Sequence, residues 1–524
     1  MKIAGMEFDY VVVGAGAAGC VVASRLSAAP GRTVLLAEYG GRPASPLISI
    51  PKGFYYTLRG DRYLYRYAVA PGAGRPAGEV WLRGRVLGGS MAVNGMMWVR
   101  GAPADWDGLA ARGNPGWGWA DIGPAYDAIE HGLGISVPPA SDEISQAILG
   151  SARSYGWQLT DDFNSRDTER IGPTPSSIAN GRRVTAYSAF IRSVKNMPGL
   201  TVKTRTRAAC LLFDGRRVIG VRIIGQAGAA TDITARREVI LCAGSIETPL
   251  LLERSGIGRA DIIRRLGARL RAESPNVGDR LVEQRGLAMQ VTLKKSAGPF
   301  RRLDSLPKQG WEGLKYLVTR RGPLATGGYD LVCQFKSDPD LPRPDVQGLF
   351  APMALDTGSG EMKLAKHSGI LFMGYPIRPE TRGSVHASGY RPEDPPVIDA
   401  RFLEAESDRN SAAPVLDTAR AVLGQGPVAE YVAGEEFPGP AVATPEQVIR
   451  YSMETGTGIY HAVGSAAMGP DDADVTDPRL RVRGVDGLRI ADASVLPVQV
   501  AGNTAAPAMA VGWRAADFIL GEDR

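Results

Sequence analysis

The sequence predicts an α/β protein, α+β overall, in which a doubly wound region of parallel strands and helices surrounds a region of antiparallel strands. Three observations predict this class. A short apolar strand at 8–13 runs directly into glycines and a helical pattern at 17–27, and a second buried strand follows at 33–38. Alternating apolar segments fill the middle of the chain, and an apolar helical pattern returns at 505–520. Nucleotide-type elements therefore stand at both ends of the chain.

Length and composition are those of a globular protein. The chain has 524 residues, of which 44% are hydrophobic and 22% charged, so we expect two or three domains and exclude a disordered chain. Four cysteines without a C-x-x-C pair exclude a disulfide scaffold and a cysteine-rich zinc site. With only four histidines, we expect no metal centre.

The order of elements can be followed along the chain. We expect strands at 200–203, 209–213, 218–224, 238–242, 286–294, 331–336 and 369–376, and one more around His386. We expect helices at 415–423, at 444–453 with Thr444 as N-cap, and at 505–520, the last broken early by Pro507. Residues 40–115 are rich in glycine, proline and arginine, and such a long irregular stretch is usually functional.

No segment is predicted to span a membrane. The most apolar stretch, 11–26, contains Arg25 and is too short for a bilayer. Glu7 and Asp9 precede it where a secretory signal would carry basic residues. We therefore expect a cytoplasmic protein without an export signal.

The net charge of +6 is concentrated in one segment, 294–321, which carries eight basic and two acidic residues. Phe300, Trp311, Tyr316 and Leu317 interleave with the basic residues. The favoured interpretation is a solvated basic surface. The alternative is an entrance lid that attracts anionic substrates or makes a peripheral contact with an anionic membrane. No nucleic-acid-binding module is recognisable, so we expect no nucleic-acid partner.

The first motif is Gly14-x-Gly16-x-x-Gly19, which follows a strand and opens a helix, with Glu38 placed 19 residues after Gly19. The glycines allow a backbone to approach a pyrophosphate at the helix N-terminus, and the acid accepts from a ribose hydroxyl. The acid favours FAD or NAD over NADP. The alternative is a glycine-rich turn that packs a helix on a strand.

Three further motifs carry small residues beside polar groups. They are GRVLGGSMAVNGMMWVR at 84–100, AGSIETPLLLERSGIG at 243–258, and GIYHAVGSAAMG around His461, which Asp492 and Asn503 follow. Taken singly, each has a plain interpretation: a flexible loop, a strand–helix joint and a structural histidine.

Together and in this order, the four motifs resemble the glucose–methanol–choline (GMC) family of FAD-dependent alcohol oxidoreductases over essentially the whole chain. The resemblance implies a Rossmann-like FAD-binding domain built from discontinuous segments, 1–155, 200–290 and 460–524. It also implies a substrate-binding domain, 156–199 and 291–459, with an antiparallel sheet and flanking helices.

The family roles are carried over where the letters match. The resemblance implies cofactor contacts at Gly14, Gly16, Ala17, Gly19, Glu38, Gly88, Gly89, Ser90, Asn94, Gly95, Met96, Ala208, Ala243, Gly244, Asp492, Ala493, Asn503 and Thr504. It implies catalytic roles for His461, as the base, and for Asn503, as its partner on the substrate oxygen.

The sequence departs from the family at four positions. Met91 replaces a second serine, Ala462 replaces a frequent proline, and Gln284 stands where many members have histidine. Val93 stands where some members carry a histidine bonded covalently to FAD, so we expect non-covalent FAD. None of these changes removes a catalytic group.

The expected reaction is oxidation of a primary alcohol to the aldehyde, with hydride transfer to flavin N5 and proton transfer to His461. The expected partners are a small-molecule alcohol and molecular oxygen or another electron acceptor. Lyase or decarboxylase chemistry on the same fold, and a non-catalytic flavin-binding partner protein, remain alternatives. His131, His367 and His386 are expected to be surface or packing residues.

Overall fold

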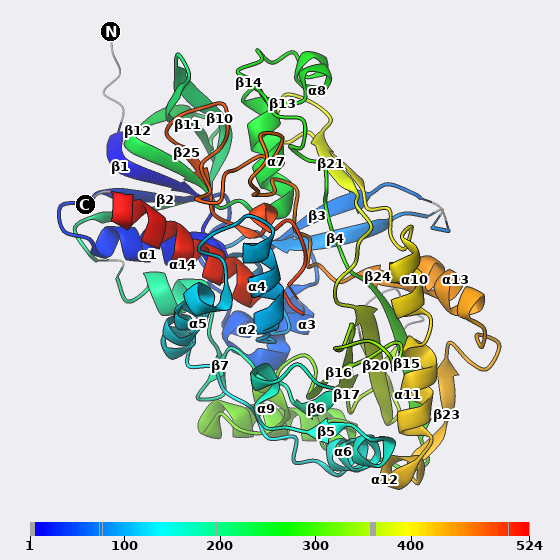
Figure 1. The fold of residues 1–524 in the computed structure, drawn as a ribbon. Coiled ribbons are helices and arrows are strands. Elements are labelled where there is room, and N and C mark those ends of the chain that lie inside the picture. Colours follow the sequence, from blue (N-terminus) through cyan, green and yellow to red (C-terminus); the bar gives the residue numbers. More distant parts are fainter. Residues whose placement is uncertain are drawn as a thin grey trace.

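Two large sheets organise the chain (Figure 1). The computed structural model describes residues 6–522 apart from 73, 76, 195, 357–362 and 501. A seven-stranded sheet lies at the upper left of Figure 1 and an eight-stranded sheet at the lower right. The predicted mixed α/β class is confirmed.

The seven-stranded sheet has the order β10-β11-β12-β1-β2-β9, with β25 beside β12. Its strands are β1 (Met6–Val13), β2 (Val34–Glu38), β9 (Leu200–Thr204), β10 (Thr206–Asp214), β11 (Arg217–Gly225), β12 (Ala230–Leu241) and β25 (Leu488–Ile490). The pairs β1·β2, β1·β12, β2·β9 and β12·β25 are parallel, whereas β10·β11 and β11·β12 are antiparallel. Valines and leucines of β1 and β2 are fully buried, which explains their continuous apolar runs.

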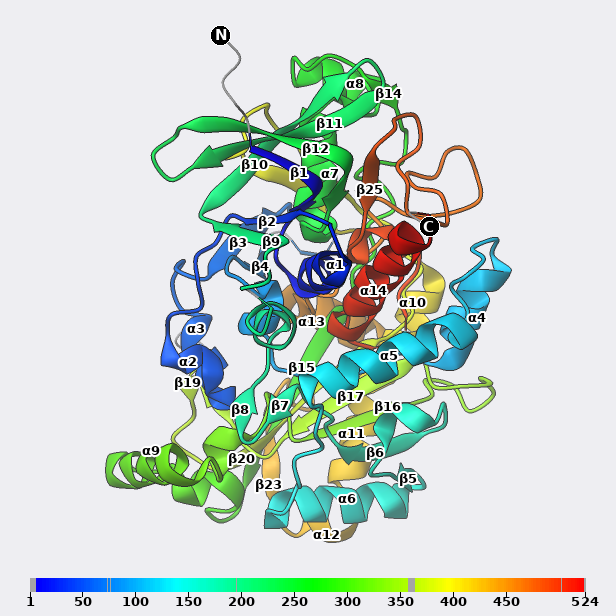
Figure 2. The ribbon, with the colours of Figure 1, turned by 90° about the vertical axis from the view of Figure 1, so that its left-hand side faces the viewer.

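Helices α1 (Ala17–Ala28) and α14 (Ala505–Glu522) pack side by side beneath this sheet (Figures 1 and 2). The expected break at Pro507 is wrong. Pro507 is the third residue of α14, and N–H groups in a first turn have no acceptor within the helix, so proline costs nothing there. The strand expected at 238–242 also begins earlier, at Ala230, because its N-terminal half pairs with β11.

The eight-stranded sheet has the order β23-β15-β20-β17-β16-β6-β5, with β24 beside β15. Its strands are β5 (Gln158–Leu159), β6 (Arg170–Pro173), β15 (Arg285–Leu293), β16 (Leu331–Phe335), β17 (Val346–Ala351), β20 (Gly369–Pro376), β23 (Val432–Phe437) and β24 (Thr457–Gly458). All pairs except β5·β6 are antiparallel. The central strands β15, β16 and β20 stand where the sequence predicted them.

Helices flank this second sheet. They include α6 (Glu143–Tyr155), α10 (Glu406–Ala412), α11 (Val415–Leu423), α12 (Gly426–Ala429) and α13 (Pro445–Thr455). The predicted cap of α13 is present: Thr444 Oγ1 accepts from the N–H of Gln447, and Gln447 Oε1 accepts from the N–H of Thr444.

The stretch 40–115, expected to be irregular, contains regular elements. They are α2 (Pro46–Ser49), α3 (Phe54–Thr57), α4 (Pro103–Ala111) and a hairpin of β3 (Leu64–Val69) and β4 (Glu79–Gly84). Tyr65 stacks on Tyr39 and Trp81 is fully buried. The hairpin is thus held by tertiary contacts, which leave little periodicity in the sequence.

The remaining α-helices and strands complete the two regions. They are α5 (Trp119–Leu133), α7 (Gly244–Arg254), α8 (Ala260–Arg265), α9 (Leu306–Thr319), β7 (Ile178–Ala179), β8 (Arg182–Arg183), β13 (Ile257–Gly258), β14 (Ala272–Glu273), β18 (Leu355–Asp356), β19 (Lys363–Leu364), β21 (Ser384–Ala387) and β22 (Pro396–Asp399). Among the described residues, no helix combines the length and apolarity that a membrane crossing requires.

The division into two domains stays a prediction. Packing favours one adjustment to it. Ile144 and Ile148 of α6 belong to the apolar cluster of the eight-stranded sheet, so α6 groups with the predicted substrate region. Ile191 belongs instead to the cluster of the seven-stranded sheet.

Candidate active site

One large cavity, of about 820 Å³, extends from the glycine turn after β1 to the inner face of the eight-stranded sheet. Among the residues that line it are Gly14, Gly16, Ala17, Glu38, Gly89, Ser90, Asn94, Gly95, Met96, Ala208, Ala243, Gly244, His461, Asp492, Ala493, Asn503 and Thr504. The structure thus brings these sequence-predicted residues together on one surface. Only Gly19 and Gly88 of the predicted set do not line the cavity.

The glycine turn is shaped by close backbone contacts. Gly14 has φ +102°, and a Cβ there would lie 2.4 Å from the carbonyl oxygen of Cys242. A Cβ on Gly19 would lie 1.9 Å from the carbonyl oxygen of Gly14, so Gly19 lets α1 pack against the turn. A Cβ on Gly16 would meet nothing within 4 Å and would project into open space. Backbone N–H groups at the start of α1 are therefore accessible to an anion.

Glu38 ends β2 beneath this turn. Its two carboxylate oxygens accept from the N–H groups of Ala15, at 2.9 Å, and Gly40, at 2.7 Å. Burial raises the pKa of Glu38, while these N–H donors and the charge of Arg85 lower it. The two donors hold the carboxyl group at the cavity wall, where it can accept from a ribose hydroxyl.

Asp492 joins the C-terminal block to α7. One of its oxygens accepts from the N–H of Gly244 at 2.9 Å and from Thr248 Oγ1 at 2.7 Å. The other accepts from the N–H of Ser494 at 2.8 Å. Gly244 has φ +86°, and a Cβ on it would again face open space. The two segments therefore form a second open cradle on the same cavity.

His461 is almost completely buried and has a partner on each ring nitrogen. Its Nδ1 lies 2.7 Å from Gln284 Oε1, and its Nε2 lies 3.1 Å from Asn503 Nδ2. Burial, and to a smaller extent the positive charge of Arg83, together lower the pKa of His461 to about 3. The imidazole is therefore neutral at physiological pH and can accept a proton.

A chain of side-chain amides fixes which nitrogen of His461 carries the hydrogen. At one end Arg170, which can only donate, bonds Gln334 Oε1 at 2.8 Å. Gln334 Nε2 donates to Gln347 Oε1, and Gln347 Nε2 donates to Asn503 Oδ1, each at 3.1 Å. Asn503 must then present its Nδ2–H group to His461 Nε2, which therefore accepts.

The same direction holds on the far side of the ring. Gln284 Nε2 donates to the carbonyl oxygen of Ile377 at 3.1 Å, so Gln284 Oε1 is free to accept from His461 Nδ1–H. A guanidinium at one end and a backbone carbonyl at the other give every bond of the chain one polarity. His461 is thereby held as the Nδ1–H tautomer, with its Nε2 lone pair on the cavity side.

Glu283 supports the backbone of His461. Its Oε1 accepts from the N–H groups of His461, at 2.8 Å, and Gln284, at 2.9 Å, and its Oε2 lies 3.4 Å from Arg83. Burial raises the pKa of Glu283, Arg83 and the two N–H donors partly offset this, and the resulting pKa is about 7. The segment that carries His461 thus rests on a buried carboxyl group.

The cavity wall on the side of the eight-stranded sheet is apolar and aromatic. It includes Tyr55, Leu349, Leu371, Met373 and Phe437. Tyr375 is also fully buried in this wall, and its ring lies edge-on to His461 at 6.0 Å between centroids. A substrate bound here would have its hydroxyl at His461 and its carbon skeleton against apolar side chains.

The cavity fits a dinucleotide such as FAD. Gly16 and Gly244 offer cradles that a side chain would fill. At the far end, Arg207 Nε and Arg254 Nε are buried without a hydrogen-bond partner in the part of the chain that the structure describes. Both residues line the cavity, where a nucleotide would supply acceptors. Val93, also in the wall, offers no nucleophilic atom.

The other histidines lie away from the cavity. His131 is in the last turn of α5 and exposed, and His367 bonds Glu436 at 2.9 Å near the surface. His386, on β21, lies 2.7 Å from Glu253 and 3.5 Å from Asp279. Burial lowers the pKa of His386, but hydrogen bonds and charge from the two carboxylates raise it to about 9. His386 is a structural ion-pair residue.

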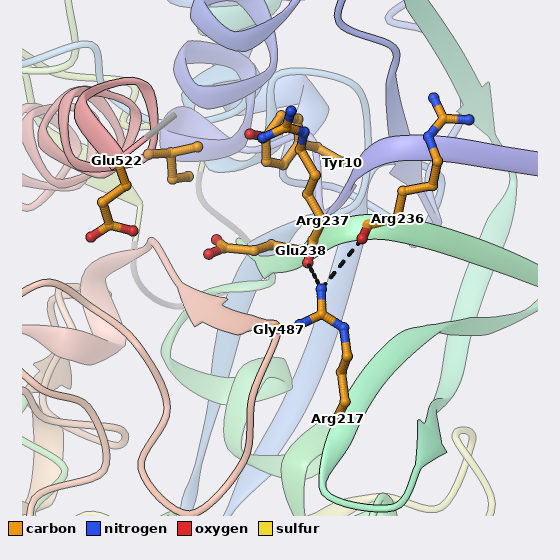
Figure 3. Close-up of a pocket in the computed structure, with 8 residues that line it drawn as sticks. Tyr10, Arg217, Arg236, Arg237, Glu238, Gly487 and Glu522 are labelled. Atoms are coloured by element: carbon orange, nitrogen blue, oxygen red, sulfur yellow. Dashed lines mark hydrogen bonds between the residues drawn. The ribbon is translucent and has the colours of Figure 1, made fainter. Parts of the chain in front are cut away.

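A second, smaller pocket carries no comparable chemistry (Figure 3). Arg217 donates to the carbonyl oxygens of Arg236 and Arg237. Glu238 and Glu522 both bond Arg489. The two acidic side chains are thus paired with an arginine outside the lining, and Arg217 is bonded to backbone carbonyls. Among the described residues, no group of three or more histidine, cysteine and acidic side chains is arranged to bind a metal ion.

Sequence reasoning missed most of the amide chain. Gln284 was noted as a departure from the family, but Arg170, Gln334 and Gln347 carried no signal. Buried Arg183 was also missed; its Nη1 bonds Asn94 Oδ1 at 2.8 Å. A glutamine on a strand can be solvated or buried, and nothing local distinguishes the two. Only the apolar neighbours of these residues along β6, β16 and β17 could have indicated that they are buried.

Comparison with known proteins shows which family the chain belongs to. A family model described as GMC oxidoreductase matches residues 8–285 with its N-terminal part and 379–512 with its C-terminal part. The chain is 31% identical to an oxygen-dependent choline dehydrogenase of Brucella ovis, over 98% of this chain and 96% of the relative. It is also 31% identical to an alcohol dehydrogenase [acceptor] of Pseudomonas putida, with the same coverage.

Among solved structures, a pyridoxine 4-oxidase from Mesorbium loti superposes with a TM-score of 0.86 at 26% identity. It covers 97% of this chain and 98% of that protein. The resemblance inferred from the four sequence motifs is confirmed: this chain belongs to the GMC oxidoreductase family.

Proposed function

We propose that this protein oxidises a primary alcohol to the aldehyde, with His461 as the base and FAD bound non-covalently as the hydride acceptor. The chain is an oxidoreductase that acts on CH–OH donors, as its family and its relatives are. The observation that carries the finer proposal is the neutral, oriented imidazole of His461 at the junction of the two cradles and the apolar wall.

The proton transfer follows from the orientation of the ring. The substrate hydroxyl gives its proton to His461 Nε2, the one ring nitrogen with a lone pair. As the imidazolium forms, the Nδ1–H bond to Gln284 Oε1 becomes charge-assisted and strengthens. Asn503, which donates to Nε2 in the substrate-free geometry, is placed to donate to the substrate oxygen instead. The site therefore stabilises the charge that develops during the reaction.

When bound, FAD supplies the hydride acceptor at its N5 position, so that the carbinol C–H bond and the O–H bond are both broken and an aldehyde leaves. Gly14, Gly16 and Glu38 would hold its adenosine diphosphate part. Asn94 and Asp492 would lie along the remainder. Val93 itself offers no side-chain atom that could bond the flavin covalently.

The walls favour an uncharged alcohol with an apolar or aromatic body. Leu371, Met373 and Phe437 offer dispersion contacts and no charge. The electrons leave to molecular oxygen or to another acceptor. A cytoplasmic location stays a prediction.

The test is anaerobic mixing of the purified yellow protein with a panel of primary alcohols, followed at the flavin absorbance. An alcohol of the panel should bleach the flavin and yield one equivalent of aldehyde. His461→Ala should retain bound FAD and bleach far more slowly. Bleaching by the variant at the wild-type rate would contradict the role of His461. Release of all flavin on acid precipitation tests the non-covalent mode, which flavin remaining in the pellet would contradict.

A further inference from the structure

Helix α9 presents an apolar stripe to solvent. Leu306, Trp311, Leu314, Leu317 and Val318 expose 82%, 65%, 54%, 59% and 77% of their surface. They are five of the sixteen large hydrophobic residues that are exposed in the described part of the chain. Trp311, Leu314 and Val318 follow one another at spacings of three and four, so they share one face of the helix.

The opposite face of α9 attaches it to the protein. Glu312 and Tyr316, four residues apart, are its buried side chains. Tyr316 donates to the carbonyl oxygen of Gly181 at 2.9 Å, and Glu312 accepts from Arg302 Nε at 2.8 Å and Nη2 at 2.7 Å. An amphipathic helix normally turns its apolar side to the core. Here the apolar side points outward, and α9 projects from the lower edge of the molecule (Figure 2).

The segment 294–321, which contains α9, carries exposed cations that we call its basic rim. Both acidic residues of the segment are paired: Asp304 with Lys308 and Glu312 with Arg302. Lys295, Lys315 and Arg321 are exposed and have no carboxylate partner within the described residues. A face that combines exposed Trp and Leu side chains with lysine and arginine is suited to the boundary between lipid headgroups and acyl chains.

We propose that α9 docks this protein on the surface of an anionic lipid bilayer, with Trp311, Leu314 and Val318 in the interfacial layer and the basic rim on the phosphates. Charge decides between this occupant and a second copy of the chain. Two copies that met through α9 would bring like charges together, whereas an anionic bilayer is complementary to them. The proposal is independent of the chemistry proposed for His461.

The experiment is flotation of the FAD-loaded protein with vesicles of phosphatidylcholine alone or with 30% phosphatidylserine. The protein should partition onto the anionic vesicles at least about 25-fold more than onto the neutral ones, since two or more unpaired cations contribute. Each cationic side chain near the surface raises the partition about fivefold. The double variant Lys315→Gln and Arg321→Gln should therefore lower the partition onto anionic vesicles roughly 25-fold. Equal partition onto both vesicle types, or no partition onto either, would overturn the proposal.

The apolar contribution is tested by the triple variant Trp311→Ser, Leu314→Ser and Val318→Ser, which should lose flotation. A matched control replaces three exposed apolar residues elsewhere, Leu270→Ser, Tyr390→Ser and Val397→Ser, and should float like wild type. Flavin absorbance and circular dichroism verify that each variant is folded. If the α9 variant still floats, the lipid proposal is wrong. It is also wrong if wild type does not bind vesicles and light scattering shows that wild type is a dimer and the α9 variant a monomer.

Discussion

Gln284 offers the sharpest test of how the base is prepared. We expect Gln284→Leu to leave FAD binding intact and to slow flavin reduction. Leucine has a similar size but removes the acceptor of His461 Nδ1–H, which lies 2.7 Å from Gln284 Oε1 in a buried site. When the imidazolium forms during the reaction, its Nδ1–H group then has no partner.

A hydrogen bond to a charged group contributes about 1.5–3 kcal/mol. At about 1.4 kcal/mol per tenfold change, its loss in the transition state should slow flavin reduction roughly 10- to 150-fold. The other tautomer would not avoid this loss, because an Nε2–H group of His461 would face the N–H donor of Asn503. Turning the Asn503 amide to accept would break its bond to Gln347.

The assay is anaerobic stopped-flow reduction at saturating alcohol, measured as a function of pH. Gln284→Glu serves as a second probe, since a carboxylate at Nδ1 favours the imidazolium and should move the acidic limb of the profile to higher pH. Gln290→Leu is the matched control. Gln290 is equally buried but bonds Leu355 and Glu436, not His461. A wild-type rate for Gln284→Leu, or an equal slowing in Gln290→Leu, would refute the tautomer argument.

Four further outcomes are expected. His461→Ala should lose about 10²–10⁴-fold in the rate of flavin reduction, because it removes a positioned base; stopped-flow measurement at saturating alcohol checks this, and a near-normal rate would contradict it. Asn503→Ala should lose less in the same assay, since an orienting donor is removed rather than the proton acceptor. The pKa of Glu283 rises to about 7 on folding, so the folded chain binds this proton more tightly than the unfolded chain does. The contribution of Glu283 to the free energy of unfolding is therefore fully present below about pH 4.5 and is lost as the pH rises through 7. Glu283→Gln should therefore flatten the urea-measured loss of stability over that range, and an unchanged slope would count against it. His386→Ala should cost about 3–5 kcal/mol in urea unfolding, because Glu253 is left buried without its partner, while flavin reduction stays within a few-fold of wild type.

Local features of the chain were determined by the sequence alone. The glycine turn at Gly14 and Gly16 and the cap at Thr444 each depend on residues within one or two turns of each other, and Glu38 follows the turn at a characteristic spacing, so short motifs reveal all three. Val415–Leu423 is likewise a helix whose ends the sequence marked. These elements follow from steric and capping rules that act over a few residues.

The direction of the amide chain was decided only by the tertiary structure. Arg170, Gln334 and Gln347 come from three strands that become neighbours only when the eight-stranded sheet forms. An amide side chain can donate or accept, so its role is set by the partner that the fold brings to it. The sequence pointed to His461 and Asn503 as candidate site residues, but not to the hydrogen-bond polarity that leaves Nε2 of the ring as the acceptor.

The orientation of α9 was likewise beyond the sequence. Its basic residues and interleaved Trp311 were visible, but an amphipathic pattern does not say which face is covered. The buried contacts of Glu312 with Arg302 and of Tyr316 with Gly181 fix the orientation of α9. The type of a residue determines which chemistry its side chain can perform. Whether it meets solvent, a partner side chain or the core depends on every element packed around it.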